Sequence, residues 1–334
     1  MAYEIGHLPP LQVGDGIFRI DSGLHRPGMV ACYLVEANGR AALVDSGTWH
    51  SVPHILEVLE ARSIPLEAVD YVIPTHIHLD HAGGAGALMR ELPNAQLIIH
   101  PFGAKHMVDP GRISQAAIAV YGEARFRADY HEIVPVDPAR IVEAPDRFET
   151  QFGGRKLTFV DTPGHAGHHF CVWDERSRGF FTGDTFGVSY RETDIDGRAL
   201  VFPTTTPVQF KPERWLESLD KLEAFKPATM YLTHFGAVHE VPRLMDDLRQ
   251  GIRVHHAVAA ETLDADDAEA EIRARLREWF MERLEAHGIG SPEQAMERLE
   301  AHGIESPEQA MERLLAIDLE LNTQGLLAWQ ARQV

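Results

Sequence analysis

Hydrophobic positions in the first hundred residues switch repeatedly between strand-like and helix-like spacing. Apolar runs or alternating patterns bounded by Gly or Asp predict strands at residues 16–20, 29–37, 41–47, 70–76 and 95–100. Between them, apolar residues at helical spacing predict helices at 51–63, behind the candidate N-cap Ser51, and at 84–92. This β-α-β-α-β alternation is typical of a layered α/β domain.

A second set of patterns follows after residue 130 and makes the chain look like two similar halves. Strands are predicted at residues 140–144, 156–165, 169–175, 179–186 and 228–236, with a helix at 212–225 and a long loop at 187–212. Residues 113–126 interrupt the rhythm with a helical pattern. This insertion either covers a site or is simply another packing helix.

The character of the chain changes after Gly236. Residues 239–330 hold no strand pattern and are rich in Ala, Glu, Leu and Arg, which predicts a helical region. We therefore divide the chain into a domain at 1–238 and a C-terminal helical region at 239–334. This region contains a 15-residue tandem duplication over 281–310, whose copies differ only at Gly290 and Glu305.

Each copy of the duplication carries its own helix signals, since Ser291 or Ser306 suits the N-cap and a proline follows it. Two copies do not make a solenoid. We expect the duplication to add one helix with a structural role.

Charge and composition narrow the range of partners. The formal net charge of -19, without a Lys/Arg cluster, argues against nucleic acid and leaves a small molecule as the expected partner, with a homodimer left open. No apolar run of membrane-spanning length and no signal peptide are found, so no membrane association and a cytoplasmic location are expected. Cys32 and Cys171 are far apart, form no CxxC motif and are predicted to be buried free thiols.

The stretch THIHLDHAGG, residues 75–84, crowds titratable side chains into a segment too short to be a helix of its own. His76 and His78, two residues apart, can project to the same side of extended backbone, and Asp80 and His81 come from the turn that follows. Imidazole and carboxylate are ligands that zinc, iron and manganese bind when thiolate is absent. The other interpretation is a polar loop of unlinked histidines.

Three later residues strengthen the metal interpretation. His165, Asp184 and His234 each follow an apolar strand. They therefore lie at the end of the strands where open α/β sheets place their sites.

The whole set resembles the metallo-β-lactamase-fold superfamily: HxHxDH, then His in TPGH, then Asp in GDT, then a late His, over about residues 12–236. The resemblance implies an α/β fold, a four-layered αβ/βα sandwich, with a dinuclear metal site. The two divalent ions would be zinc, with iron and manganese as alternatives. The implied ligands are His76, His78 and His165 for one ion, Asp80, His81 and His234 for the other, and Asp184 as the bridge.

Water held between two dications loses its proton near neutral pH and can attack a carbonyl, with Asp80 available to orient it. The chain looks like the glyoxalase II, lactonase and thioesterase branch, which implies hydrolysis of a small ester, thioester or lactone. Asp184 stands where some β-lactamases need Cys, and His78 where di-iron flavoproteins have Glu. The alternatives are a mononuclear iron oxygenase of the persulfide type, making little use of His234, and a metal-containing binding or regulatory protein.

Several neighbours have both a functional and a structural interpretation. Asp45 either orients the histidine loop or is a turn aspartate, and one of His168 and His169 is expected to support the site or pack in its strand. For three others a packed or surface role is preferred over contact with substrate: Tyr121, Tyr190 and Arg191.

Overall fold

The computed structural model describes residues 7–206, 209–289 and 306–333, which divide into two compact units. Unit 1 comprises Met1–Thr162, His168–Gly183 and Lys221–His239. Unit 2 comprises Pro163–Gly167, Asp184–Asp220 and Glu240–Val334. The second unit therefore contains two segments from the middle of the chain in addition to the C-terminal region.

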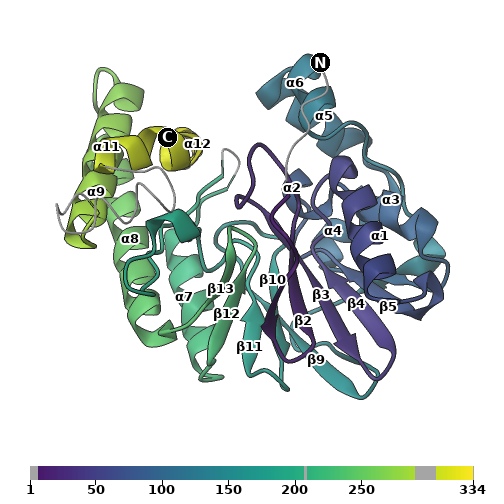
Figure 1. The fold of residues 1–334 in the computed structure, drawn as a ribbon. Helices are drawn as coiled ribbons and strands as arrows, with labels where there is room; N and C mark the ends of the chain where they lie inside the picture. The colour runs from purple at the N-terminus through teal and green to yellow at the C-terminus, as the bar shows by residue number, and fades with distance from the viewer. Residues whose placement is uncertain (1–6, 207–208, 290–305, 334) are drawn as a thin grey trace. The chain divides into compact units, whose positions relative to one another are not determined.

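Unit 1 contains a seven-stranded sheet whose strands are ordered as they occur in the sequence (Figure 1). Its first four strands pair antiparallel and the last four, which share β4, pair parallel. The strands are β1 (Leu11–Gly14), β2 (Ile17–Asp21), β3 (Ala31–Ala37), β4 (Arg40–Val44), β5 (Val69–Ile73), β6 (Gln96–Ile99) and β7 (Ile141–Glu143).

Helices cover the outer face of this sheet and short helices connect its strands (Figure 1). The α-helices of unit 1 are α1 (Val52–Ala61), α2 (Leu79–Ala82), α3 (Ala85–Glu91), α4 (Pro101–Val108), α5 (Gly111–Tyr121) and α6 (Glu123–Asp129). The 3-10 turns are η1 (Trp49–Ser51), η2 (Leu66–Ala68) and η3 (Pro138–Arg140). α5 and α6 stand at the edge of unit 1 that also carries α2 (Figure 1).

The second sheet of unit 1 has six strands in the order β13-β12-β11-β10-β9-β8, of which only β11 and β12 pair parallel. Phe225, just after helix α7 (Pro212–Glu223), packs against Trp173 and Phe180 of this sheet. The strands are β8 (Glu149–Phe152), β9 (Arg155–Asp161), β10 (Phe170–Asp174), β11 (Gly179–Phe181), β12 (Thr229–Leu232) and β13 (Gly236–Val238).

Successive side chains of β3 point to opposite faces of the first sheet, so the strand packs against its covering helices on one face and against the second sheet on the other. Cys32 and Leu34 are buried against the helices that cover the first sheet. Tyr33 points the other way, meets the rings of Phe181 and Tyr231, and donates a hydrogen bond to the Leu232 carbonyl. Because successive strand residues face opposite sides, a strand buried on both faces is almost wholly apolar. The predicted α/β fold, two sheets flanked by helices, is confirmed.

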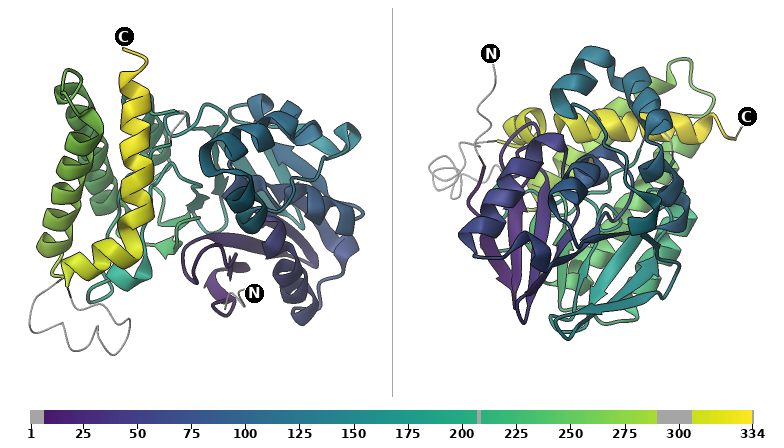
Figure 2. Two further views of the ribbon diagram at one scale, coloured as in Figure 1. Left: turned by 90° about the horizontal axis from the view of Figure 1, so that it is seen from above. Right: turned by 90° about the vertical axis from the view of Figure 1, so that its right-hand side faces the viewer.

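The helices from Val241 onward belong to unit 2 and form the predicted C-terminal helical region (Figure 2). Gln330, near the chain end, donates hydrogen bonds to the Ala259 carbonyl and to the Thr262 hydroxyl at the end of α8. The described helical segments of this region are α8 (Val241–Glu261), α9 (Ala268–Ala286), α11 (Pro307–Ala310), the π-helical turn η5 (Met311–Leu315) and α12 (Ala316–Gln330).

Most of the duplicated segment lies outside the described residues, including Ser291, Gly290 and Glu305. The second copy is described from Ser306, whose hydroxyl accepts a hydrogen bond from the Gln309 backbone amide, as predicted for an N-cap.

Several element boundaries differ from the sequence predictions. The helix expected over 113–126 breaks at Gly122, which has a φ of 80°, into α5 and α6. The strand expected over 228–236 becomes β12 and β13, and η4 (Arg191–Thr193) interrupts the predicted loop. Helix α4 and strands β1 and β8 were not predicted: β1 and β8 are four residues each and mostly not buried, so they have little apolar signal.

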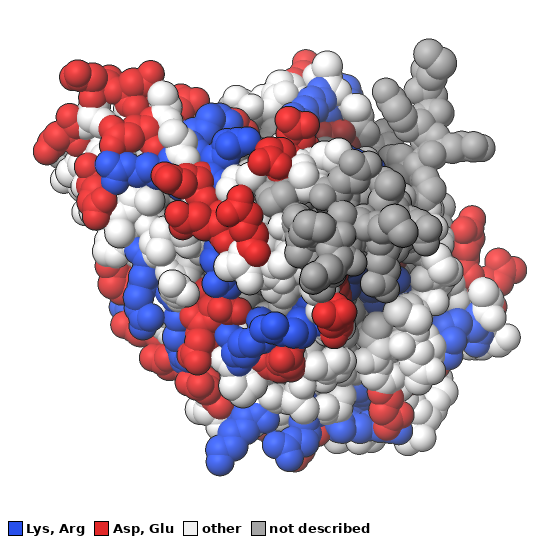
Figure 3. Space-filling view, turned by 60° about the vertical axis from the view of Figure 1, so that its left-hand side comes forward, with Lys and Arg blue, Asp and Glu red and all other residues white. Residues whose placement is uncertain are grey.

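The described residues agree with two expectations about composition. Cys32 and Cys171 are free and buried, as predicted. None of the helices in the described ranges combines the length and apolar character that spanning a membrane requires. On the face drawn in Figure 3, acidic and basic side chains are interspersed.

Candidate metal centre

The candidate ligands follow the carboxyl ends of strands, which is where α/β sheets place their binding sites. In unit 1, β5 ends at Ile73 shortly before His76 and His78, and β12 ends at Leu232 shortly before His234. The segment after β5 then turns into α2, which places Asp80 and His81 in its single turn. The candidate ligands of unit 2 are His165 and Asp184.

Asp80, His81 and His234 form one group in unit 1. A carboxylate oxygen of Asp80 lies 3.4 Å from His81 Nε2 and 3.3 Å from His234 Nε2. One ligand atom from each residue lies within 4.8 Å of the others, so the three could hold a single metal ion. His81 is fully buried and His234 nearly so, which fixes both rings in place.

The buried carboxylate of Asp45 holds the backbone and rings around this group. Its oxygens accept hydrogen bonds from the Thr75 amide and hydroxyl and from the Thr233 hydroxyl, at 2.8, 2.9 and 2.6 Å. Asp45 also lies 2.9 Å from His81 Nδ1. Because that contact occupies Nδ1, His81 presents Nε2 toward Asp80. The structure therefore supports an orienting role for Asp45, beyond that of a turn residue.

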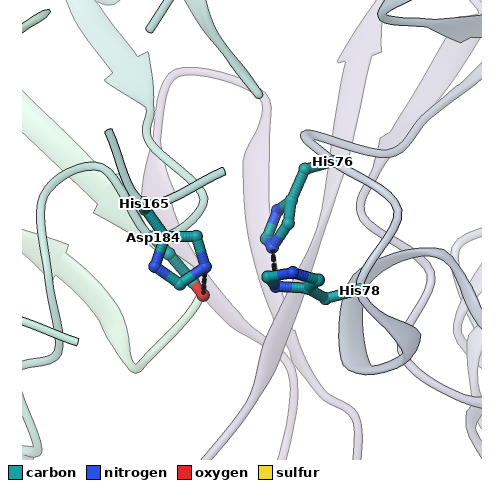
Figure 4. Close-up of side chains that lie close together, drawn as sticks. All are labelled: His76, His78, His165 and Asp184. Atoms are coloured by element: carbon teal, nitrogen blue, oxygen red, sulfur yellow. Dashed lines mark hydrogen bonds and ion pairs between the residues drawn. The ribbon is translucent and has the colours of Figure 1, made fainter. Parts of the chain in front are cut away.

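His76 and His78 form a pair in unit 1, with His76 Nε2 2.7 Å from His78 Nδ1 (Figure 4). Two ring nitrogens this close either share one proton or face a common cation. The ring of His168 lies 6.2 Å from that of His76 and 5.6 Å from that of His78, and His169 lies 4.8 Å from His76. Both later histidines therefore border the pair.

His165 and Asp184 form the corresponding pair in unit 2, with His165 Nε2 3.1 Å from an Asp184 carboxylate oxygen (Figure 4). His165 Nδ1 is 2.8 Å from the Thr204 carbonyl oxygen, which fixes the ring so that Nε2 faces Asp184. Both side chains are buried. A buried carboxylate and imidazole in this arrangement are suited to ligating a cation.

Two glycines in the motifs are required by close packing. Gly183, which precedes Asp184, has a φ of 48°, and a Cβ there would lie 2.5 Å from both His169 Nε2 and Thr75 Oγ1. Gly164, which precedes His165, has a φ of 147°, and its Cβ would lie 2.4 Å from the Trp215 Cβ. Residues other than glycine rarely adopt either backbone conformation. The two glycines therefore allow the backbone next to Asp184 and His165 to pack closely against neighbouring residues.

The charges around Asp80 affect its acidity and that of two tyrosines. Burial disfavours the charged carboxylate, but the imidazoles of His81 and His234 outweigh burial and hold the pKa of Asp80 well below its usual range. Burial, and then the Asp80 charge, raise the pKa of Tyr121 and, more strongly, of Tyr130. Both phenols therefore remain protonated hydrogen-bond donors at neutral pH.

Two other sequence candidates have structural roles in unit 2. Tyr190 is buried and donates a hydrogen bond of 3.0 Å to Asp318 of α12, so the packed interpretation is confirmed. Arg191 is not simply a solvated surface residue, because it donates to the Ser189 carbonyl and pairs with Asp194.

Thr75 and Thr233 are part of the site and were missed in the sequence. Each immediately precedes a candidate ligand, His76 or His234, and each donates its hydroxyl to Asp45. The sequence does contain a signal, since both lie in a Thr-His pair that follows an apolar strand.

Comparison with known proteins places this site in context. The family model of the metallo-beta-lactamase superfamily matches residues 25–234, which include all seven predicted ligands. The metallo-beta-lactamase fold-containing protein ST1585 of Sulfurisphaera tokodaii is 25% identical over 236 residues, covering 70% of this chain and 82% of that protein. The acyl-coenzyme A thioesterase MBLAC2 of Gallus gallus is 25% identical over 236 residues, covering 67% of this chain and 80% of that one.

A solved structure agrees with the fold. The metallo-beta-lactamase family protein TTHA1429 from Thermus thermophilus superposes with a TM-score of 0.60 at 20% identity, covering 90% of this chain and 94% of that chain. A match of the family model over more than half of the chain decides the classification. The chain therefore belongs to the metallo-beta-lactamase superfamily.

Proposed function

We propose that this protein is a metal-dependent hydrolase that uses two divalent ions to cleave a small ester, thioester or lactone, with a thioester as the first candidate. One ion would be held by His76, His78 and His165 and the other by Asp80, His81 and His234, with Asp184 shared. Zinc is the first candidate metal, with iron and manganese as alternatives, because nitrogen and carboxylate ligands suit all three.

One repeated arrangement carries the proposal. In His81, His234 and His165, Nδ1 is anchored by Asp45, the Met29 carbonyl and the Thr204 carbonyl respectively. In each of the three, Nε2 faces a candidate ligand carboxylate at 3.1 to 3.4 Å. Metal-binding histidines in proteins are held in this way, with one ring nitrogen fixed by the protein so that the other is presented to the ion.

The donor set fits two dications. Five imidazoles and two carboxylates provide neutral and anionic ligands in a ratio suited to divalent charge. When bound, the two ions would lower the pKa of a water molecule toward neutrality and polarise the substrate carbonyl.

The chain's own residues would position and assist this reaction. Asp80 is ionised at neutral pH, as an aspartate ordinarily is, so its carboxylate can accept a hydrogen bond and orient the attacking water. Tyr121 is half-buried, and its ring lies 6.0 Å from that of Tyr130 and under the guanidinium of Arg125, so we assign it the packed role that the sequence favoured and no contact with substrate.

The choice of a thioester is supported by the relative named as an acyl-coenzyme A thioesterase. At 25% identity this relative supports the reaction class more strongly than the acyl group. A mononuclear oxygenase that makes little use of His234 is disfavoured, because His234 shares the Asp80 carboxylate with His81.

The proposal is tested by replacing His76 with alanine. The variant His76→Ala should lose about one metal ion per chain and about 100-fold or more of its hydrolytic rate, because an ion loses one of its few protein ligands. Metal content is measured by plasma mass spectrometry on protein purified without chelators, and hydrolysis on a panel of acyl thioesters, esters and lactones.

The matched control is His106→Ala, which removes a histidine of α4 that is not among the seven candidate ligands. It should retain both metal and activity. Full hydrolysis by His76→Ala protein of verified metal content would overturn the ligand assignment. Metal-loaded wild-type protein that turns over no member of the panel would favour the binding or regulatory alternative.

A further inference from the structure

Unit 2 contains a pocket of about 130 Å³ that the proposed reaction does not use. We call it the arginine pocket, because three of its seven lining residues are arginines. Its lining residues are Arg198, Leu200, Arg243, Asp247, Arg283, Ala286 and His287. They come from the 184–220 segment, from α8 and from the end of α9, so three separate parts of unit 2 direct guanidinium groups to one place.

Two of the arginines are held in place by one carboxylate. Arg243 donates to one oxygen of Asp247 at 3.1 Å, and Arg283 approaches the other oxygen at 3.0 Å. Arg243 also bonds Glu240 and the Ala199 carbonyl. Such a network fixes the guanidinium planes in advance, which lowers the entropy that ligand binding would otherwise cost.

The charges of the network do not balance. Three guanidinium groups face two carboxylates, those of Asp247 and Glu240. Arg198 is exposed and its guanidinium makes no ion pair with the described residues, while the buried Nε–H of Arg283 has no hydrogen-bond partner among them. α9 ends here, and its negative end contributes only about half a charge. The lining of the pocket therefore has a net positive charge, which favours an anion as ligand.

We propose that the arginine pocket binds the phosphate group of a small anion. Arg198 and Arg283 keep N–H groups outside these ion pairs, and a tetrahedral anion offers such donors more acceptor oxygens than a carboxylate does. A pocket of about 130 Å³ has room for a phosphate group. The phosphate is either free or the end group of a larger metabolite.

The test compares two single-charge variants of the full-length, metal-loaded protein. Arg198→Gln removes the arginine whose guanidinium is outside the ion-pair network. Arg275→Gln removes a half-exposed arginine of α9 that pairs with Glu261 and Glu271 and does not line the pocket. Binding of inorganic phosphate is measured by titration calorimetry at constant ionic strength, with chloride as the reference anion. Phosphate held by the metal ions contributes equally to all proteins, so differences between them report on the pocket.

We expect Arg198→Gln to weaken phosphate binding about tenfold, because a charge-assisted hydrogen bond is lost, and Arg275→Gln to leave it unchanged. Arg198→Lys, which keeps the charge and loses the planar fork, should fall between them. Equal affinities for Arg198→Gln and Arg275→Gln would overturn the proposal, and so would acetate binding as tightly as phosphate. Tighter, Arg198-dependent binding of glycerol phosphate would support a metabolite end group, and equal binding would support free phosphate.

Discussion

At the scale of single residues, the site is a set of histidine rings whose orientation is set by other side chains. Asp45 shows how much depends on one such support. Its two oxygens serve Thr75, His81 and Thr233, so it ties the segment after β5 to the segment after β12. A carboxylate suits this position because it accepts hydrogen bonds and donates none.

Replacing Asp45 with asparagine tests this support. One oxygen of Asn can still accept from Thr75, but the amide NH₂ would donate toward His81 and Thr233, where acceptance is needed. We expect Asp45→Asn to lower affinity for the ion at Asp80, His81 and His234 by about 10- to 100-fold. Competition with a chromophoric chelator measures this loss. Asp70→Asn, which removes a carboxylate paired with Arg40, is the control, and equal affinity in both variants would contradict the role of Asp45.

The candidate ligands could be predicted from the sequence, whereas the residues that orient them could be predicted only in part. The ligands stand out in the sequence because His and Asp recur after apolar strands in a fixed order. Thr75 and Thr233 do not stand out, since threonine is common in strands and loops for other reasons. Their role depends on a carboxylate 30 and 188 positions away, which local patterns do not contain.

At the scale of elements, predictability follows burial. The central strands β3 and β4 are nearly all buried and gave continuous apolar patterns, whereas β1 and β8 are short and partly exposed. The α5–α6 insertion had two interpretations in the sequence. α5 has no buried residue, so it is not simply a core helix, and the Asp80 charge acts on its last residue, Tyr121.

The pair of helices α8 and α9 has a built-in acid sensitivity. His255 of α8 is fully buried, with Nδ1 2.9 Å from the Gly251 carbonyl oxygen and its ring edge-on to Trp279 of α9. Burial lowers the pKa of His255 to about 4, and the hydrogen bond to Gly251 opposes this only in part. In the unfolded chain the pKa of histidine is about 6.5.

The sign of the pH effect follows from these two values. Well above a pH of about 6.5 the His255 imidazole is neutral in the folded and the unfolded state and does not change the free energy of unfolding. Below about pH 6.5 the unfolded chain binds a proton at this imidazole and the folded chain does not, so the folded state loses stability as the pH falls toward 4. Between about pH 7.5 and 5 the free energy of unfolding should fall by about 2 kcal/mol through this group. His255→Gln should show a pH-dependent loss smaller by that amount in urea unfolding followed by tryptophan fluorescence. His256→Gln, a half-exposed neighbour, should keep the wild-type pH dependence, and identical profiles for both variants would contradict the argument.

At the scale of the whole molecule, the units are assembled from segments that are distant in the sequence. Unit 2 takes in Pro163–Gly167 and Asp184–Asp220 from the middle of the chain as well as the C-terminal helices. The sequence indicated a change from strand patterns to helical patterns after Gly236. It did not indicate that the two earlier segments belong to unit 2, because composition does not report contacts between residues a hundred or more positions apart. The consequence is that the C-terminal region supports a candidate ligand.

The connection runs from α12 to His165. Asn322 of α12 accepts a hydrogen bond from the Thr205 amide at 2.7 Å and donates one to the Pro203 carbonyl at 3.2 Å. Between these two residues lies Thr204, whose carbonyl fixes the His165 ring. Asn322 is fully buried, so both bonds are made away from water and are costly to lose.

This connection predicts different effects for the loss of Asn322 and for the loss of one copy of the duplication. Deleting residues 296–310 joins Ala295 to Met311, and because the copies match there, the sequence entering η5 is unchanged. We expect this deletion to leave metal content and hydrolysis within about twofold of wild type, because α12 and Asn322 are retained. Asn322→Ala, by contrast, leaves the Thr205 amide and the Pro203 carbonyl without their buried partner and should lower metal affinity about 10-fold or more. Metal content and chelator competition on both proteins decide the matter: loss of metal on the deletion, with Asn322→Ala unaffected, would place the duplication in the support of the site and remove α12 from it.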